Sequence, residues 1–271
     1  MFKNLNNKKV IIGLVHLLPM PGTPQYTEGN LDIMTKKAIE DCLTLKENGA
    51  DGGLLQTVDN VYPVGDDSDY ARVAALAMIA ARVRDAVGPD FKLGVQLMWN
   101  CITPSLAVAK ATGADFIRCT ALVGSTPSPF GGTINADPLK VMDYRRKIDA
   151  GNVAILAEIS GYHFTGEYNA KNIQNLAGMV MRVGGDAVEV VSRDFDMNER
   201  LVKDIKALNP SIPVILGGGT DVENCKARLR YADGALVGTA FEGGKWGGPI
   251  IGSIVAEYMR KVRELEEELS K

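Results

Sequence analysis

The chain has 271 residues, 46% of them hydrophobic and 23% charged, a composition typical of a soluble globular protein with a large core. Its formal net charge of -3 at pH 7 leaves no basic surplus to neutralise phosphates, which argues against nucleic acid and anionic membranes as partners. No run reaches the roughly 18 apolar residues of a membrane span, and the polar residues 1–9 lack the apolar segment of a signal peptide, so we expect a cytoplasmic protein without membrane insertion.

Eight short apolar runs alternate with helical patterns along the whole chain, without a break in composition. The expected strands cover residues 10–15, 53–55, 92–97, 115–119, 153–159, 187–191, 213–216 and 235–237. The expected helices cover residues 32–48, 70–87, 104–112, 137–149, 170–183, 197–208, 221–230 and 250–269. Strands rich in Val, Ile and Leu predict a parallel sheet that is buried on both faces. The sequence therefore predicts a single α/β domain over residues 1–271, a (β/α)₈ TIM barrel.

Four junctions between a helix and the next strand share a small phrase of glycine or alanine followed by aspartate. The aspartates are Asp51, Asp115, Asp186 and Asp233. Glycine ends a helix in a left-handed cap, and the aspartate then begins the next strand. In a barrel these junctions lie at the N-terminal face, so we interpret the four aspartates as structural rather than catalytic.

Two glycine turns follow the last two predicted strands: Gly217, Gly218 and Gly219 after the first, and Gly238 and Thr239 after the second. In this fold the loops after strands seven and eight commonly hold a phosphate. Thr220 and Asp221 are predicted N-caps, which would point the free N–H groups of helix 221–230 at the first turn. The alternative is that the three adjacent glycines only allow a strand and a helix to pack closely.

Ionisable side chains concentrate at the C-terminal ends of the predicted strands, where a barrel enzyme carries its active site. The candidate catalytic residues are His16, Arg118, Glu158, His163 and Glu189. The chain has only two histidines, and both fall on this rim. Buried carboxylates there require a cation, a metal or a substrate hydroxyl as partner. The alternative is a buried arginine–carboxylate network that only holds the rim together.

Other chemistries have weaker support. His16, Glu158, His163 and Glu189 are conceivable metal ligands, but no HxH or HExxH spacing supports a metal, and the residues identify no cofactor. The cysteines are dispersed without a CxxC pair, which argues against structural zinc. Lys92 and Lys245 are poorly placed for a Schiff base. No GxSxG or Rossmann fingerprint follows a strand.

Three long segments are expected to border the site. Residues 17–30 form an entry flap stiffened by prolines, and residues 121–136 form a mobile lid with Phe130 at its tip. Residues 243–249 could close over a phosphate through Lys245. The alternative for all three is an ordinary surface loop, or a contact in an oligomer.

Three phrases in the chain carry a family resemblance: VHLLPMPGTP at residues 15–24, ATGADFIR at 111–118, and the pair LGGGT at 216–220 with ADGALVGT at 232–239. With these phrases the chain resembles the BtpA/SgcQ family over nearly its whole length. The resemblance implies a phosphate-binding barrel of the ribulose-phosphate-binding group. It also implies a link either to photosystem I accumulation, as in photosynthetic members, or to sugar-uptake operons.

Matched residue by residue, the resemblance retains His16, Arg118, His163 and the glycine turns. The chain departs from the family pattern at Gln56 and Thr57, where relatives tend to carry an acidic residue and then asparagine, and at Ser160, where they tend to carry a histidine. Each of these departures removes a potential acid, base or metal ligand.

Two hypotheses follow. The first is an enzyme for a small phosphorylated sugar or nucleoside-like metabolite, with Glu158 or Glu189 as general base, His16 or His163 moving a proton, and Arg118 stabilising negative charge. Isomerisation, epimerisation and retro-aldol cleavage suit that inventory, and glycosidic cleavage by the two carboxylates is a further option. The second is a non-catalytic assembly or regulatory factor that keeps the barrel. For either one we expect a homo-oligomer.

Overall fold

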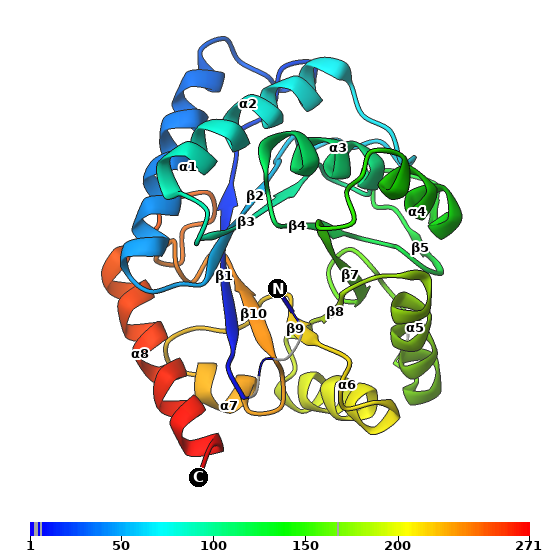
Figure 1. The fold of residues 1–271 in the computed structure, drawn as a ribbon, viewed down its shortest axis with the longest axis vertical. Coiled ribbons are helices and arrows are strands. Elements are labelled where there is room, and N and C mark those ends of the chain that lie inside the picture. The colour runs from blue at the N-terminus through cyan, green and yellow to red at the C-terminus, as the bar shows by residue number, and fades with distance from the viewer. Residues whose placement is uncertain (3–4, 6, 167) are drawn as a thin grey trace.

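The computed structural model describes residues 1–2, 5, 7–166 and 168–271, and in it eight parallel strands close into a barrel surrounded by helices (Figure 1). The strands are β1 Val10–His16, β2 Gly52–Gln56, β3 Lys92–Gln96, β4 Phe116–Cys119, β7 Ala154–Ser160, β8 Ala187–Val190, β9 Val214–Leu216 and β10 Gly234–Val237. Their order around the barrel is β1-β10-β9-β8-β7-β4-β3-β2. The predicted TIM barrel is confirmed, and β1 and β7 stand on opposite sides of it.

Eight helices follow the strands in the described part of the chain. They are α1 Asn30–Glu47, α2 Tyr70–Val87, α3 Ile102–Thr112, α4 Pro138–Lys147, α5 Ala170–Val183, α6 Phe195–Leu208, α7 Cys225–Leu229 and α8 Gly252–Leu269. Side-chain caps set several of the starts: the Asp69 carboxylate, for example, accepts hydrogen bonds from the amides of Ala71 and Arg72. None of these helices has both the length and the apolar character needed to cross a membrane.

The predicted helix 221–230 is wrong at its start. Residues 222–224 form a turn, and α7 begins only at Cys225. Asp221 still acts as a cap for this turn, because its Oδ1 accepts the amides of Glu223 and Asn224, both at 2.9 Å, and its carbonyl oxygen accepts the amide of Cys225 at 3.0 Å. The glycine turn after β9 is therefore followed by a turn and not by the first turn of a long helix.

The predicted lid at residues 121–136 contains a small antiparallel hairpin that the sequence analysis did not identify. Strands β5 Ser125–Pro127 and β6 Thr133–Asn135 form it, and they are too short to show an alternating pattern. Phe130 at the tip packs its ring 5.1 Å from Tyr62 and 5.2 Å from Trp99, measured between ring centroids. These aromatic contacts hold the tip against the loops that follow β2 and β3.

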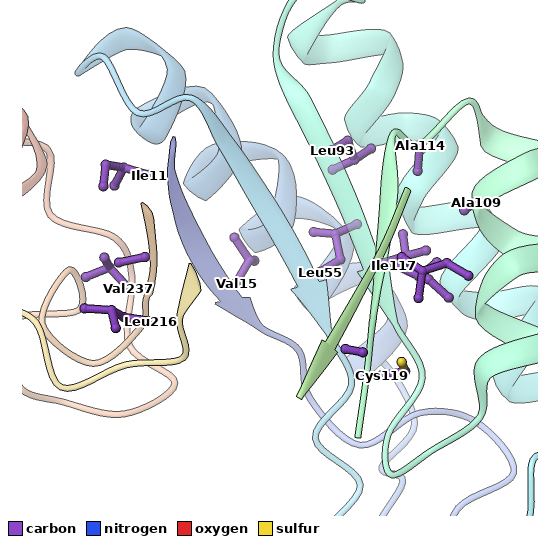
Figure 2. Packing of buried hydrophobic residues seen from close by; sticks show 14 of the residues in the cluster. Ile11, Val15, Leu55, Leu93, Ala109, Ala114, Ile117, Cys119, Leu216 and Val237 are labelled. Carbon is purple, nitrogen blue, oxygen red and sulfur yellow. The ribbon is translucent and has the colours of Figure 1, made fainter. Parts of the chain in front are cut away.

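Two hydrophobic layers fill the molecule because successive strand residues point to opposite faces. Ile11 and Val15 of β1 point outward into the layer between sheet and helices, which Figure 2 shows from close by. Val10, Ile12 and Leu14 point into the barrel. Phe2 and Phe116 pack edge to face within this inner layer, with centroids 5.7 Å apart. The inner layer fills the N-terminal half of the barrel, so open space lies at the C-terminal end.

The aspartates at the four helix-to-strand junctions each accept a hydrogen bond from a backbone amide near the start of the preceding strand. We call them the junction aspartates: Asp51, Asp115, Asp186 and Asp233. Their carboxylates accept the amides of Ile11 at 2.8 Å, Leu93 at 3.0 Å, Ile155 at 3.0 Å and Val214 at 2.7 Å, respectively. Each also pairs with at least one cation, such as Arg84 for Asp115 and Lys206 for Asp233. These contacts support the predicted structural role.

Candidate functional site

A cavity of about 850 Å³ opens at the C-terminal ends of the strands. Its lining comes from strand ends all around the barrel: His16, Gln56, Arg118, Tyr162, His163, Arg193, both glycine turns, residues 220–223, Ala240, Gly244 and Trp246, with Leu14, Val237 and Ile254. Three of the five candidate catalytic residues, His16, Arg118 and His163, thus share one cavity with all five predicted phosphate-binding residues. Glu158 and Glu189 lie behind this lining and are fully buried.

The first glycine turn needs glycine for two separate reasons. At Gly217 an added Cβ would overlap the carboxylate of Glu189. Gly218 and Gly219 adopt φ angles of +146° and +72°, which other residues rarely adopt. The amides of Gly218, Gly219, Thr239 and Ala240 find no hydrogen-bond acceptor among the described residues. These N–H groups border the cavity and are available to an anion.

Arg118, at the end of β4, organises the ionisable residues of the rim. Its Nε donates to Glu189 Oε2 at 2.6 Å and its Nη2 to Glu189 Oε1 at 2.5 Å, a bidentate pair. Nη2 also lies 3.4 Å from Glu158 Oε2, and Nη1 donates to Gln56 Oε1 at 3.1 Å. We call Arg118, Glu158, His163 and Glu189 the rim cluster. It contains the arginine–carboxylate network expected as the structural alternative, and Arg118 still borders the cavity.

His163 and Glu158 form a pair within the rim cluster. His163 Nδ1 lies 2.6 Å from Glu158 Oε2, while Glu158 Oε1 accepts the amides of His163 at 2.8 Å and Phe164 at 3.1 Å. The rings of Trp99 and His163 pack nearly at right angles, with centroids 4.5 Å apart. The carboxylate thus fixes both the backbone and the ring of His163.

The two buried glutamates have opposite electrostatic environments. Burial alone would raise the pKa of the Glu158 carboxyl, but the charge and hydrogen bonds of His163, together with Arg118, outweigh it and lower that pKa to about 2. For Glu189 burial prevails over Arg118, and the neighbouring Glu158 adds to it, so the pKa of the Glu189 carboxyl is raised. Glu158 is therefore held ionised, and Glu189 is the carboxyl of the two that more readily takes up a proton.

A second histidine–glutamate pair on the other side of the cavity includes a residue that the sequence analysis missed. His16 Nδ1 lies 2.8 Å from Glu242 Oε1, and Glu242 Oε2 accepts the amide of Gly247 at 3.1 Å. Both side chains are almost fully buried. Glu242 lies in a loop beyond β10, and the one signal for it was a lone carboxylate beside Phe241 in a glycine-rich segment after a barrel strand.

Three further residues that were not among the candidates also line the cavity: Tyr162, Arg193 and Trp246. The loop at 243–249 was expected to approach a phosphate through Lys245, but Lys245 is exposed and does not line the cavity. Gly244 and Gly247, both with positive φ, flank the segment in which Trp246 lines the cavity; Trp246 is 56% exposed, and its ring centroid is 5.2 Å from that of His16. Approach of Lys245 to a bound phosphate therefore stays a prediction.

The conceivable metal ligands have different partners: His16 bonds Glu242, His163 bonds Glu158, and Glu189 pairs with Arg118. No group of three or more His, Cys, Asp or Glu suited to a metal ion occurs among the residues that the structure describes.

Comparison with known proteins places these features in a family. A sequence model of the BtpA family matches residues 7–267. An uncharacterized protein from Archaeoglobus fulgidus is 32% identical over 260 residues, which cover 94% of this chain and 97% of that protein. The photosystem I biogenesis protein BtpA from Synechocystis sp. is 25% identical over 245 residues, 89% of this chain and 83% of that protein.

Solved structures share the fold at low sequence identity. Tryptophan synthase from Mycobacterium tuberculosis superposes with a TM-score of 0.62 at 17% identity, covering 95% of this chain and 94% of that chain. (S)-3-O-geranylgeranylglyceryl phosphate synthase from Thermoplasma acidophilum, solved with its substrate sn-glycerol-1-phosphate, gives a TM-score of 0.58 at 17% identity and the same coverage. At such identities the likeness establishes the barrel fold.

Proposed function

The chain belongs to the BtpA family, and from this premise we propose that it is an enzyme that binds a small phosphorylated metabolite and moves a proton on it. The phosphate would rest on the glycine turns, and the remainder of a sugar-like or nucleoside-like substrate would extend over the mouth of the barrel. The reaction class is isomerisation, epimerisation or a lyase reaction, all of which need a base to take a proton from a substrate that carries a carbonyl group.

One observation carries this proposal: a single cavity joins the amide-rich glycine turns to His16, Arg118 and His163. An anion held by the turns would position its substrate against the ionisable side chains. The barrel from Thermoplasma acidophilum, solved with sn-glycerol-1-phosphate, supports the idea that this architecture can hold a phosphate monoester.

The position of each side chain in the wall of the cavity suggests its role. Glu158 and Glu189 lie behind Arg118 and are committed to it and to His163, so we assign proton transfer to the histidines rather than to the carboxylates. Arg118 borders the cavity and can stabilise negative charge that develops on a substrate oxygen. The two glutamates then hold Arg118 and His163 in place.

A second candidate function is a non-catalytic assembly factor. It is favoured by the same ion pairs, because both carboxylates of the rim cluster are satisfied without any ligand. The relative from Synechocystis sp. is named for photosystem I biogenesis, which fits this alternative. In that case the cavity would bind a metabolite without converting it.

Thermal shift measurements test phosphate binding. The probes are inorganic phosphate, ribose 5-phosphate, ribulose 5-phosphate, sn-glycerol-1-phosphate and AMP, each ester compared with its dephosphorylated form. At a concentration of 100 Kd, a bound ester is expected to raise Tm by about 5–10 °C. Equal shifts with and without the phosphate, or no shift with any ester, would contradict the site.

A pair of variants matched in backbone conformation provides the control. Gly219→Ala places a side chain at φ +72° in the cavity, and Gly132→Ala does so at φ +74° in the hairpin loop, outside the cavity lining. Both should lower stability similarly through backbone strain, but only Gly219→Ala should reduce the shift caused by the ester. Deuterium uptake from ²H₂O into a bound ester then separates the two functions, because an assembly factor would bind without exchange.

Three expectations from the sequence are also part of this proposal: one domain over residues 1–271, a homo-oligomer, and a cytoplasmic location. Light scattering measures the oligomeric state, cell fractionation measures the location, and a single calorimetric transition would support one domain.

A further inference from the structure

We propose that the two histidines act as a pair of acid–base groups on opposite sides of the substrate, so that the reaction inverts the configuration of the carbon that loses its proton. This inference rests on the proposed function and specifies its stereochemistry. It assigns Glu242 and Glu158 as positioning residues for His16 and His163.

The order of the strands places the two histidines on opposite sides of the barrel. His16 is the last residue of β1, and His163 follows the end of β7 by three residues. In the order β1-β10-β9-β8-β7-β4-β3-β2, four steps separate β1 from β7 in either direction, so the two strands are diametrically opposed. Both histidines line the same cavity. A ligand in it therefore meets one imidazole from each side.

The two histidines form the same kind of hydrogen bond, from Nδ1 to a buried glutamate. Each Nδ1 bonds a buried glutamate, at 2.8 Å for His16 with Glu242 and at 2.6 Å for His163 with Glu158. A carboxylate at Nδ1 keeps the proton on that nitrogen and leaves Nε2 as the nitrogen that exchanges a proton with the ligand. Each glutamate is itself held by a backbone amide, of Gly247 or of His163.

The chemistry balances without a co-reactant. The C–H bond next to the carbonyl breaks, its proton goes to Nε2 of one neutral imidazole, and its electron pair moves onto the carbonyl oxygen. Arg118, which borders the cavity, stabilises that oxyanion. The other imidazole, in its protonated form, gives its Nε2 proton to the opposite face of the same carbon as the electron pair returns. Proton exchange with water then resets both histidines.

The test uses sugar phosphates that are epimers at the carbon next to the carbonyl, in ²H₂O: ribulose 5-phosphate with xylulose 5-phosphate, and fructose 6-phosphate with allulose 6-phosphate, followed by proton NMR. The expected result is deuterium uptake with interconversion of one pair. His16→Gln should remove exchange from one epimer while leaving it in the other, and His163→Gln should do the reverse. Exchange that retains configuration, or that one variant abolishes for both epimers, would overturn the two-base proposal and leave the proposed function standing.

No exchange with any probe, despite phosphate-dependent binding, would instead count against the enzyme function itself and with it against this inference. Glu242→Gln tests the positioning role: it should slow exchange about 10²- to 10⁴-fold for the epimer that His16 serves, and leave the other epimer unchanged. A merely structural loss would slow both. Glu47→Gln, on the exposed face of α1, is the matched control and should alter neither.

A measurement on the unaltered protein keeps the inference testable if Glu242→Gln does not fold. Because the chain has only two histidines, ¹⁵N-histidine labelling yields two ring systems. Both are expected to show a protonated, hydrogen-bonded Nδ1. A neutral ring with its proton on Nε2 and a bare Nδ1 would overturn the assignment for that histidine.

Discussion

The two ends of the barrel use the same ions in different ways. At the N-terminal face each junction aspartate has its own backbone amide and its own cation, and its side chain keeps 17–33% of its surface exposed. At the C-terminal face Glu158 and Glu189 are completely buried and share Arg118. The charges are therefore paired individually and partly exposed to solvent at the first face, whereas at the second face they are paired collectively and buried away from solvent.

This difference separates charges that tie strands together from charges that serve a site. A partly hydrated pair is worth little when intact and costs little when broken. A buried cluster is costly to assemble, and removing one member leaves the others without compensation. The rim cluster borders the cavity. We therefore interpret the free-energy cost of burying these charges as necessary to hold Arg118 and His163 fixed in a low-dielectric environment.

The largest expected effect comes from removing Arg118, the cation that the two buried carboxylates share. Arg118→Met leaves two buried carboxylates without their shared cation, and we expect it to lower the free energy of unfolding by about 3–5 kcal/mol. Urea denaturation followed by circular dichroism measures this. Lys92→Met, which removes a partly exposed partner of Asp115, should cost about 1 kcal/mol. Equal losses in both variants would contradict the contrast between the two faces.

The next effect concerns pH. Because the pKa of Glu158 is lowered to about 2 in the folded protein, its ionisation stabilises the fold fully above about pH 4.5 and loses that contribution as pH falls toward 2. The loss is on the order of 3 kcal/mol. The difference in unfolding free energy between the wild type and Glu158→Gln should therefore shrink between pH 5 and the lowest pH at which both fold.

Asp51 at the other face sharpens this test, because burial raises the pKa of its carboxyl. A raised folded-state pKa means that the folded protein holds the proton more tightly, so this contribution to stability is present at low pH and declines as pH rises. The difference between the wild type and Asp51→Asn should change with pH in the opposite direction to that for Glu158→Gln. A common direction would be evidence against the assigned environments.

The smallest effect compares one glycine from each face. In Gly217→Ala the new methyl group overlaps the Glu189 carboxylate, so the rim cluster has to shift, and we expect a loss of about 1–3 kcal/mol. Gly151, in the turn before β7, has open space around its Cβ position, so Gly151→Ala should be neutral or slightly stabilising. Thermal denaturation of both variants is the measurement, and equal stability would remove the link between the turn and the cluster.

Much of the fold could be predicted because its signals are local. All eight predicted barrel strands agree with the observed ones to within one residue at each end, since buried parallel strands are short apolar runs between helical patterns. The glycine turns and the polar strand ends were visible for the same reason. The start of α7 and the β5–β6 hairpin could not be predicted, because elements of three to five residues are too short to show a periodic pattern.

Chain order and residue type were enough to indicate a barrel and to place His16, Arg118, Glu158, His163 and Glu189 on one rim, because parallel strands bring all their carboxyl ends to the same face. The partners of those residues depended on closure of the sheet. His16 meets Glu242 across 226 positions of sequence, and Arg118 meets Glu189 across 71. No local pattern encodes such a pairing, since it arises from which loop the packed barrel brings against each strand end.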